Sequence, residues 1–230
     1  MKKKKLIIAV ILIVLILAGL FQVTKLRTFQ LFGALTYHAE TEEKVIALTF
    51  DDGPTKNVDQ LLPLLDEYNA KATFFLIGNE IEKHPEEAKK LFEAGHQIGN
   101  HTYSHKRMVL KSPSFIKEEI EKTDELIRSI GYTEEIDFRP PYGKKFIGLP
   151  YYLNKHNKET IMWSLDPETY YTSVNEKISY VLENIEPGSI ILLHPMYDQT
   201  GETLQVVETI LQELKNEGYR FVTVDELQAL

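Results

Sequence analysis

The stretch Val45-Ile-Ala-Leu-Thr-Phe-Asp-Asp-Gly-Pro54 decides how the rest of the chain is interpreted. Its first six residues are mostly apolar or β-branched, and Gly-Pro is a turn signal, so the pattern predicts a buried strand that ends at Asp51 and Asp52. Neighbouring residues on an extended chain point in different directions. We therefore expect one carboxylate to face a metal ion and the other to face substrate, although Asp-Asp-Gly alone is also ordinary turn chemistry.

The N-terminal residues differ in composition from the remainder. Lys2–Lys5 form a basic cluster, and residues 6–23 are uncharged, almost all aliphatic and long enough to cross a membrane. No clean cleavage site follows, so an uncleaved anchor with its lysines inside the cell is favoured over a cleaved signal peptide, which would release a secreted protein. The expected organisation is a basic cytoplasmic tail (1–5), a membrane anchor (6–23), a stem or extra strand (24–43) and an extracytoplasmic catalytic domain (44–230).

Charge and cysteine content restrict the possible functions. Residues 1–27 hold six of the 26 basic side chains and none of the 34 acidic ones, so the remainder carries a net charge of −14. Such an acidic domain argues against nucleic acid as a partner and favours a neutral or weakly charged one. Because the chain has no cysteine, a metal ion must be bound by His, Asp or Glu.

Apolar β-type runs alternate with helical patterns after residue 44. Strands are expected at 45–50, 72–77, 97–99, 137–139, 160–164, 189–193 and 220–224. Helices are expected at 58–68, 85–94, 113–130, 149–154, 174–185 and 203–217. The alternation predicts an α/β fold with a parallel sheet, either a barrel of about seven strands or a doubly wound sheet. The barrel is favoured because no Gly-rich phosphate loop follows a strand and reactive residues follow several different strands.

Two histidines, in His101-Thr-Tyr-Ser-His105, are candidate metal ligands. If this segment is helical, both rings lie on one face and can bind one ion. Asp52 completes a site of two histidines and one carboxylate that leaves positions open for water, a common hydrolytic arrangement. Zinc is the favoured divalent ion, and cobalt, nickel, manganese or iron also suit this ligand set.

A hydrolytic metal site also needs a base and an acid. Asp51 is placed to be the base, and His194, which ends an apolar strand, can protonate a leaving group. Arg139 can orient a carboxylate and keep it ionised. The two prolines after it restrict the backbone, so that the N–H of Tyr142 can face a developing oxyanion.

Four motifs resemble those of the polysaccharide deacetylase family, the NodB-homology domains of carbohydrate esterase family 4. They are Thr49-Phe-Asp-Asp-Gly53, His101-Thr-x-x-His105, Arg139-Pro-Pro-Tyr142 and Leu193-His194, and the resemblance covers about residues 45–230. It implies a distorted parallel (β/α) barrel, preceded here by one transmembrane helix, and metal-dependent removal of acetyl groups from sugar polymers. The implied roles are base for Asp51, metal ligand for Asp52, His101 and His105, general acid for His194, tether of Asp51 for Arg139, oxyanion contact for the Tyr142 backbone and acetyl-methyl pocket for Leu193.

One motif departs from the family pattern. The family usually has an Asp-Trp pair whose Asp supports the arginine or the acid histidine, whereas Trp163-Ser-Leu-Asp-Pro-Glu-Thr-Tyr170 has Thr169 and Tyr170 at those places. Either Asp166 takes over the support, or the pKa of His194 is less elevated for want of a carboxylate partner. Trp163 and Tyr170 can offer aromatic surface to a sugar ring.

The sequence therefore predicts a metal-dependent deacetylase of an extracellular N-acetylated glycan. Peptidoglycan N-acetylglucosamine is favoured because a short anchor keeps the enzyme near the cell wall. An O-acetyl esterase acting on a polysaccharide such as xylan is the alternative enzyme, and a non-catalytic glycan-binding domain is the alternative of another class. We expect a monomer that contacts the membrane through its N-terminal helix.

Overall fold

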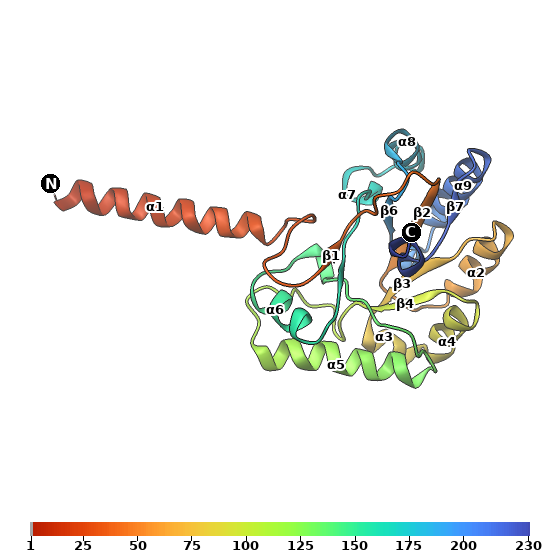
Figure 1. The fold of residues 1–230 in the computed structure, drawn as a ribbon, viewed down its shortest axis with the longest axis horizontal. Coiled ribbons are helices and arrows are strands. Elements are labelled where there is room, and N and C mark those ends of the chain that lie inside the picture. The colour runs from red at the N-terminus through yellow and green to blue at the C-terminus, as the bar shows by residue number, and fades with distance from the viewer. Residues whose placement is uncertain (1) are drawn as a thin grey trace.

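A computed structural model describes residues 2–230 (Figure 1). Its first element, helix α1 (Lys2–Val23), stands away from the remainder of the molecule. The apolar stretch Lys3–Val23 is long enough to cross a membrane, and none of it is buried within the protein. Exposed aliphatic surface of this extent is unfavourable in water, as expected for a membrane anchor or a signal sequence.

In residues 2–230, seven strands form two parallel sheets. They are β1 (Leu35–Thr36), β2 (Val45–Asp51), β3 (Ala72–Leu76), β4 (Gln97–Asn100), β5 (Thr160–Ile161), β6 (Ile190–Leu193) and β7 (Arg220–Phe221). The larger sheet has the order β4-β3-β2-β6, with β7 also paired to β2, and β1 pairs with β5. Single-residue parallel bridges join Asn100 to Phe138, Phe138 to Thr160, and Leu165 to Ile191. The predicted α/β fold with parallel strands is confirmed, while the strand expected at 137–139 is reduced to the bridge at Phe138.

Strand β2 lies at the centre of the larger sheet, and all seven of its residues are buried. Ile46, Leu48 and Phe50 pack in the largest apolar cluster, whereas Val45 and Ala47 pack in a second cluster. This alternation follows from the two-residue period of a strand that is covered on both faces. The stable core therefore positions the two aspartates that end the strand.

Nine further helices lie between and after the strands in residues 2–230. They are α2 (Val58–Glu67), α3 (Gly78–Lys83), α4 (Pro85–Glu93), α5 (Pro113–Ser129), α6 (Gly148–Lys155), α7 (Pro167–Tyr170), α8 (Val174–Asn184), α9 (Glu202–Asn216) and α10 (Val224–Gln228). The largest apolar cluster includes buried residues of α2, α4 and α9, which lie along the larger sheet (Figure 1). The six predicted helices are present within one residue at each end.

Three short helices and strand β1 were not predicted individually. The strand expected at 220–224 ends at Phe221, and Thr223 is the N-cap of α10 instead. The Thr223 side chain accepts a hydrogen bond from the Glu226 N–H, and the Glu226 carboxylate accepts one from the Thr223 N–H. This reciprocal capping box stabilises a helix start in place of further strand.

Candidate functional site

A cavity of about 320 Å³ lies at the carboxyl ends of β2, β4 and β6. Its lining residues are Asp51, Asp52, His101, His105, Tyr142, Gly143, Trp163, Asp166, Thr169, Leu192 and His194. Segments far apart in the sequence meet here because parallel strands end on the same side of the sheet. The structure thus brings the predicted base, acid and metal ligands into one cavity.

Asp51 is held by a buried arginine. Arg139 Nη1 donates to Asp51 Oδ1 at 2.8 Å and to the Thr49 hydroxyl at 2.7 Å, and the guanidinium also donates to the carbonyl oxygens of Ile161 and Met162. Burial by itself raises the pKa of Asp51, but the charges of Arg139, His101 and His194 lower it overall. The contact predicted between Arg139 and Asp51 is present, and it keeps the carboxylate ionised.

Asp52, His101 and His105 form a three-ligand group whose donor atoms all lie within 4.8 Å of one another. Asp52 Oδ1 is 3.3 Å from His105 Nε2 and 3.8 Å from His101 Nε2. His101 Nδ1 lies 2.8 Å from the Arg139 carbonyl oxygen, which accepts the ring N–H and leaves Nε2 free as a ligand. Asp52 Oδ1 is buried without a hydrogen-bond partner among residues 2–230. A cation fits between these converging acceptors.

The segment that carries the two histidines is a loop, so the helix considered for it is wrong. Thr102 and His105 have φ angles of 69° and 53°, in the left-handed region. Local side chains stabilise these turns: the Asn100 side-chain oxygen accepts from the Thr102 N–H at 2.8 Å, and the Thr102 hydroxyl accepts from the His105 N–H at 3.1 Å. Two tight turns, instead of a shared helix face, bring both rings to Asp52.

His194 has a carboxylate partner that sequence reasoning missed. Glu168 Oε2 lies 2.8 Å from His194 Nδ1 and accepts the His194 backbone N–H at 2.9 Å. Burial opposes the charged imidazole, but the Glu168 hydrogen bond and the nearby Asp51 raise the pKa of His194 to about 9. The raised pKa favours the protonated imidazole, and the alternative in which His194 lacks a carboxylate partner is not what the structure shows.

Asp166 does not take over the support of Arg139 or His194. Its two carboxylate oxygens accept from the Thr169 N–H and the Thr169 hydroxyl, so it caps helix α7. No hydrogen bond joins it to Arg139 or His194 within the part of the chain that the structure describes. The Pro167-Glu168 dipeptide was the available signal, since it places another acid on the same short turn.

The predicted substrate-contacting residues separate into two groups. Leu193 is fully buried in the largest apolar cluster, and Leu192, one residue earlier, lines the cavity instead. Adjacent residues of β6 face opposite sides, which explains the one-residue error. Trp163 lines the cavity, whereas Tyr170 is 60% exposed and lines a neighbouring one.

Tyr142 stands at the mouth of the site. Its φ of 60° lies in the left-handed region, and its ring centre is 4.8 Å from that of His105. The ring therefore packs against His105, one member of the three-ligand group, and lines the cavity. The role of its N–H at an oxyanion stays a prediction.

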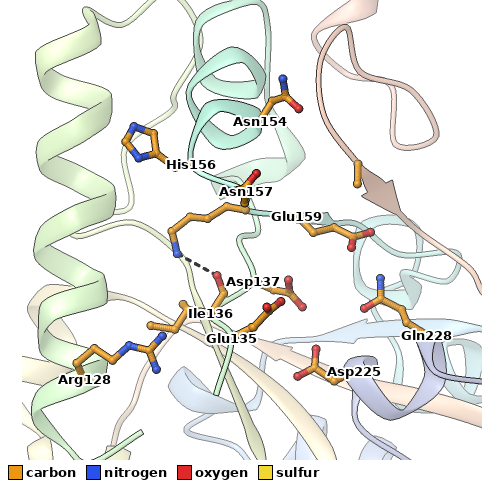
Figure 2. Close-up of a pocket in the computed structure, with 12 residues that line it drawn as sticks. Arg128, Glu135, Ile136, Asp137, Asn154, His156, Asn157, Glu159, Asp225 and Gln228 are labelled. Atoms are coloured by element: carbon orange, nitrogen blue, oxygen red, sulfur yellow. Dashed lines mark hydrogen bonds between the residues drawn. The ribbon is translucent and has the colours of Figure 1, made fainter. Parts of the chain in front are cut away.

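A second cavity of about 530 Å³ is lined by Asp137, Asp225 and ten other residues (Figure 2). Gln97, which begins β4, donates to Asp137 Oδ2 at 3.1 Å and to Asp225 Oδ1 at 2.6 Å. Burial and the neighbouring Asp225 raise the pKa of Asp137 to about 8. Among residues 2–230 this cavity has no group of three converging metal ligands, so the smaller cavity is the candidate active site.

Comparison with known proteins identifies consistent similarities. The family described as Polysaccharide deacetylase matches residues 38–161. A peptidoglycan-N-acetylglucosamine deacetylase of Bacillus cereus is 35% identical over 199 residues, which cover 85% of this chain and 93% of that protein. The crystal structure of a peptidoglycan N-acetylglucosamine deacetylase in complex with a benzamide has a TM-score of 0.76 and 32% identity, covering 84% of this chain and 92% of that one. A CE4 family pseudoenzyme from Bacillus anthracis has a TM-score of 0.76 and 27% identity, covering 86% and 70%.

Proposed function

The chain belongs to the polysaccharide deacetylase family, and from this premise and the geometry of the site we propose that it removes acetyl groups from an extracellular N-acetylated glycan. Peptidoglycan N-acetylglucosamine is the favoured substrate because relatives that act on it are similar over most of the chain. The observation that carries the proposal is one cavity lined by the three-ligand group, by Asp51, which Arg139 holds, and by His194, which Glu168 holds.

Different residues of the site have different roles in amide hydrolysis. A divalent ion, for which zinc is our proposal, would be held by Asp52, His101 and His105 and would supply Lewis-acid polarisation of the acetyl carbonyl. Asp51 keeps Oδ1 on Arg139, so Oδ2, 3.6 Å from His101 Nε2, is free to accept the proton of the attacking water.

The acid step is assigned to His194. The Glu168 carboxylate accepts a hydrogen bond from the Nδ1–H of His194. The proton on Nε2 is therefore the one that can be transferred to the departing nitrogen. Leu192 lines the wall where the acetyl methyl would lie, and the Tyr142 N–H is assigned to the developing oxyanion.

The elevated pKa of His194 favours amide over ester hydrolysis. An amine is a poor leaving group until it is protonated, whereas an alkoxide from an ester depends less on a strong proton donor. A histidine whose pKa is raised to about 9 stays protonated across neutral pH. We therefore place N-deacetylation ahead of the O-acetyl esterase alternative.

The remaining parts of the proposal concern the closure of the sheet, the membrane anchor and the oligomeric state. We infer that the single-residue bridges close the strands into a distorted barrel, and that α1 is an uncleaved single-pass anchor with the catalytic domain outside the cell. We also infer a monomer. The unburied apolar surface of α1 and the basic Lys2–Lys5 cluster support the membrane orientation.

Acetate release by the full-length protein in detergent tests the function. The substrates are N-acetylglucosamine oligomers, cell-wall fragments and acetylated xylan, each with metal-stripped and zinc-refilled enzyme. We expect zinc-restored release from the N-acetylated substrates and its loss in Asp51→Asn. Stoichiometric zinc binding without release would instead support a binding domain, as a pseudoenzyme among the similar structures suggests.

A further inference from the structure

The segment that follows α1 is docked beside the active site. Thr24 is buried, and its carbonyl oxygen accepts the Lys145 N–H at 3.2 Å. The Lys145 ammonium donates to the carbonyl oxygen of Leu26, and burial lowers the pKa of Lys145 to about 8. These bonds go to main-chain oxygens, so the path of residues 24–27 is held without the use of their charged side chains.

Lys25 and Arg27 line a cavity of about 190 Å³ that adjoins the active-site cavity. The two cavities have Tyr142, Gly143, Trp163, Asp166 and Thr169 in common. The Arg27 guanidinium carbon lies 6.0 Å from the centre of the Trp163 ring system. The juxtamembrane segment therefore contributes side chains to a continuation of the catalytic cleft.

Positive charge is concentrated at this place. Four cationic side chains here have no carboxylate oxygen within 4.0 Å of their nitrogen atoms in residues 2–230, although the domain as a whole is acidic. They are Lys25, Arg27, Arg107 and Lys144. Lys25, Arg27 and Lys144 line the same cavity, and burial, followed by the charges of Lys25 and Arg107, lowers the pKa of Lys144. Asp166 is the acidic residue of the cavity wall, and Thr169 binds both its oxygens.

A buried donor at the shared wall also lacks a partner. The Trp163 indole N–H is buried with no acceptor among residues 2–230. An unpaired buried donor is costly, so it favours a ligand that brings an acceptor. Unneutralised cations, an orphan donor and aromatic surface at one wall are together suited to a negatively charged sugar.

We propose that Lys25, Arg27 and Lys144 form a subsite for a carboxylate carried by the glycan next to the sugar that loses its acetyl group. The subsite rests on the proposed function and narrows its substrate class from N-acetylated glycans in general to those that carry a carboxylate. Phosphates of anionic lipids are the other anions near the end of α1. The wall shared with the catalytic cavity favours the glycan, because the cavity that Arg27 lines adjoins the cavity that holds the candidate catalytic residues.

Equilibrium binding to the full-length protein in detergent tests the subsite. Trp163 is the single tryptophan, so its fluorescence reports on the shared wall. The ligands are a peptidoglycan tetrasaccharide with free carboxylates and the same compound with every carboxylate amidated. Binding is measured in the Asp51→Asn background to prevent turnover, with Lys25→Gln/Arg27→Gln as the test variant and exposed Lys117→Gln as the matched control.

We expect the free-carboxylate form to bind about tenfold more tightly than the amidated form, a difference lost in the test variant and kept in Lys117→Gln. Equal affinity for the two forms, or a preference that persists in the test variant, would overturn the proposal. A test variant that loses only its affinity for phosphatidylglycerol vesicles would assign the cations to the membrane and overturn it as well. Acetate release from both forms is measured separately, so a failed deacetylase assay is distinguishable from a failed subsite.

Discussion

Replacement of Glu168 by glutamine is the most informative single change. Glu168 Oε2 lies 2.8 Å from His194 Nδ1, and glutamine can still accept the ring N–H there through its amide oxygen. The variant therefore removes the negative charge while it keeps the tautomer of the ring. We expect the pKa of His194 to fall and the alkaline limb of the pH–rate profile to move to lower pH.

The magnitude follows from the raised pKa of His194. The rise from 6.5 to about 9 has several causes, of which the Glu168 hydrogen bond is the largest favourable one. The His194 side chain is 39% exposed, so solvent screens part of the effect, and we assign about one pKa unit, or about 1.4 kcal/mol, to the charge of Glu168. A cation bound by Asp52 would lower both pKa values alike, so the displacement between the two enzymes is the predicted quantity.

The assay is kcat for acetate release from about pH 6 to 10 with Glu168→Gln and wild-type enzyme. We expect little change near pH 7 and a loss of about tenfold near pH 10, because protonated His194 is then scarce in the variant. Glu183→Gln, an exposed change on α8, is the control. An alkaline limb that stays within about 0.3 pH units of wild type would refute the assignment of His194 as the acid supported by Glu168.

Three further predictions concern binding and stability. Zinc at about 100 times its Kd should stabilise the wild-type protein by about 2.7 kcal/mol in thermal unfolding, and loss of this shift in His105→Ala checks the ligand set. Arg139→Met should lower the free energy of unfolding in urea by about 3–5 kcal/mol because Asp51 stays buried without its partner. The exposed Arg220→Met should lower it by under about 1 kcal/mol, and equal losses in the two variants would contradict this prediction. The pKa of Asp137 is raised from 3.8 to about 8, so the folded state binds more protons and stability falls as pH rises through this window, by up to about 1.4 kcal/mol per unit. Asp137→Asn should therefore raise Tm at about pH 8 more than at about pH 4, and the opposite order would count against a raised pKa of the buried Asp137 carboxyl.

Local sequence patterns predicted the secondary structure well. The run that ends at Asp51 and Asp52 predicted a buried strand, because burial on both faces requires a continuous apolar stretch. The amphipathic helices were predicted within one residue at each end, since their periodicity and their terminal prolines and glycines are local signals. The motif residues of the metal group and the base were also predicted, because each follows directly from its own strand or turn.

Tertiary structure decided what depends on contacts between distant segments. Glu168 binds His194, which lies 26 residues further along the chain. Lys145 binds the Thr24–Leu26 backbone, which lies about 120 residues earlier. Periodic sequence patterns predict local structure and do not predict contacts between residues so far apart in the sequence. Left-handed turns at Thr102 and His105, instead of a helix, bring the two imidazoles to Asp52. Sequence by itself determined which chemical groups the chain places at the ends of its strands. Packing of the whole domain determined which groups touch, because hydrogen bonds and pKa shifts depend on distances of a few ångströms that only the folded backbone sets.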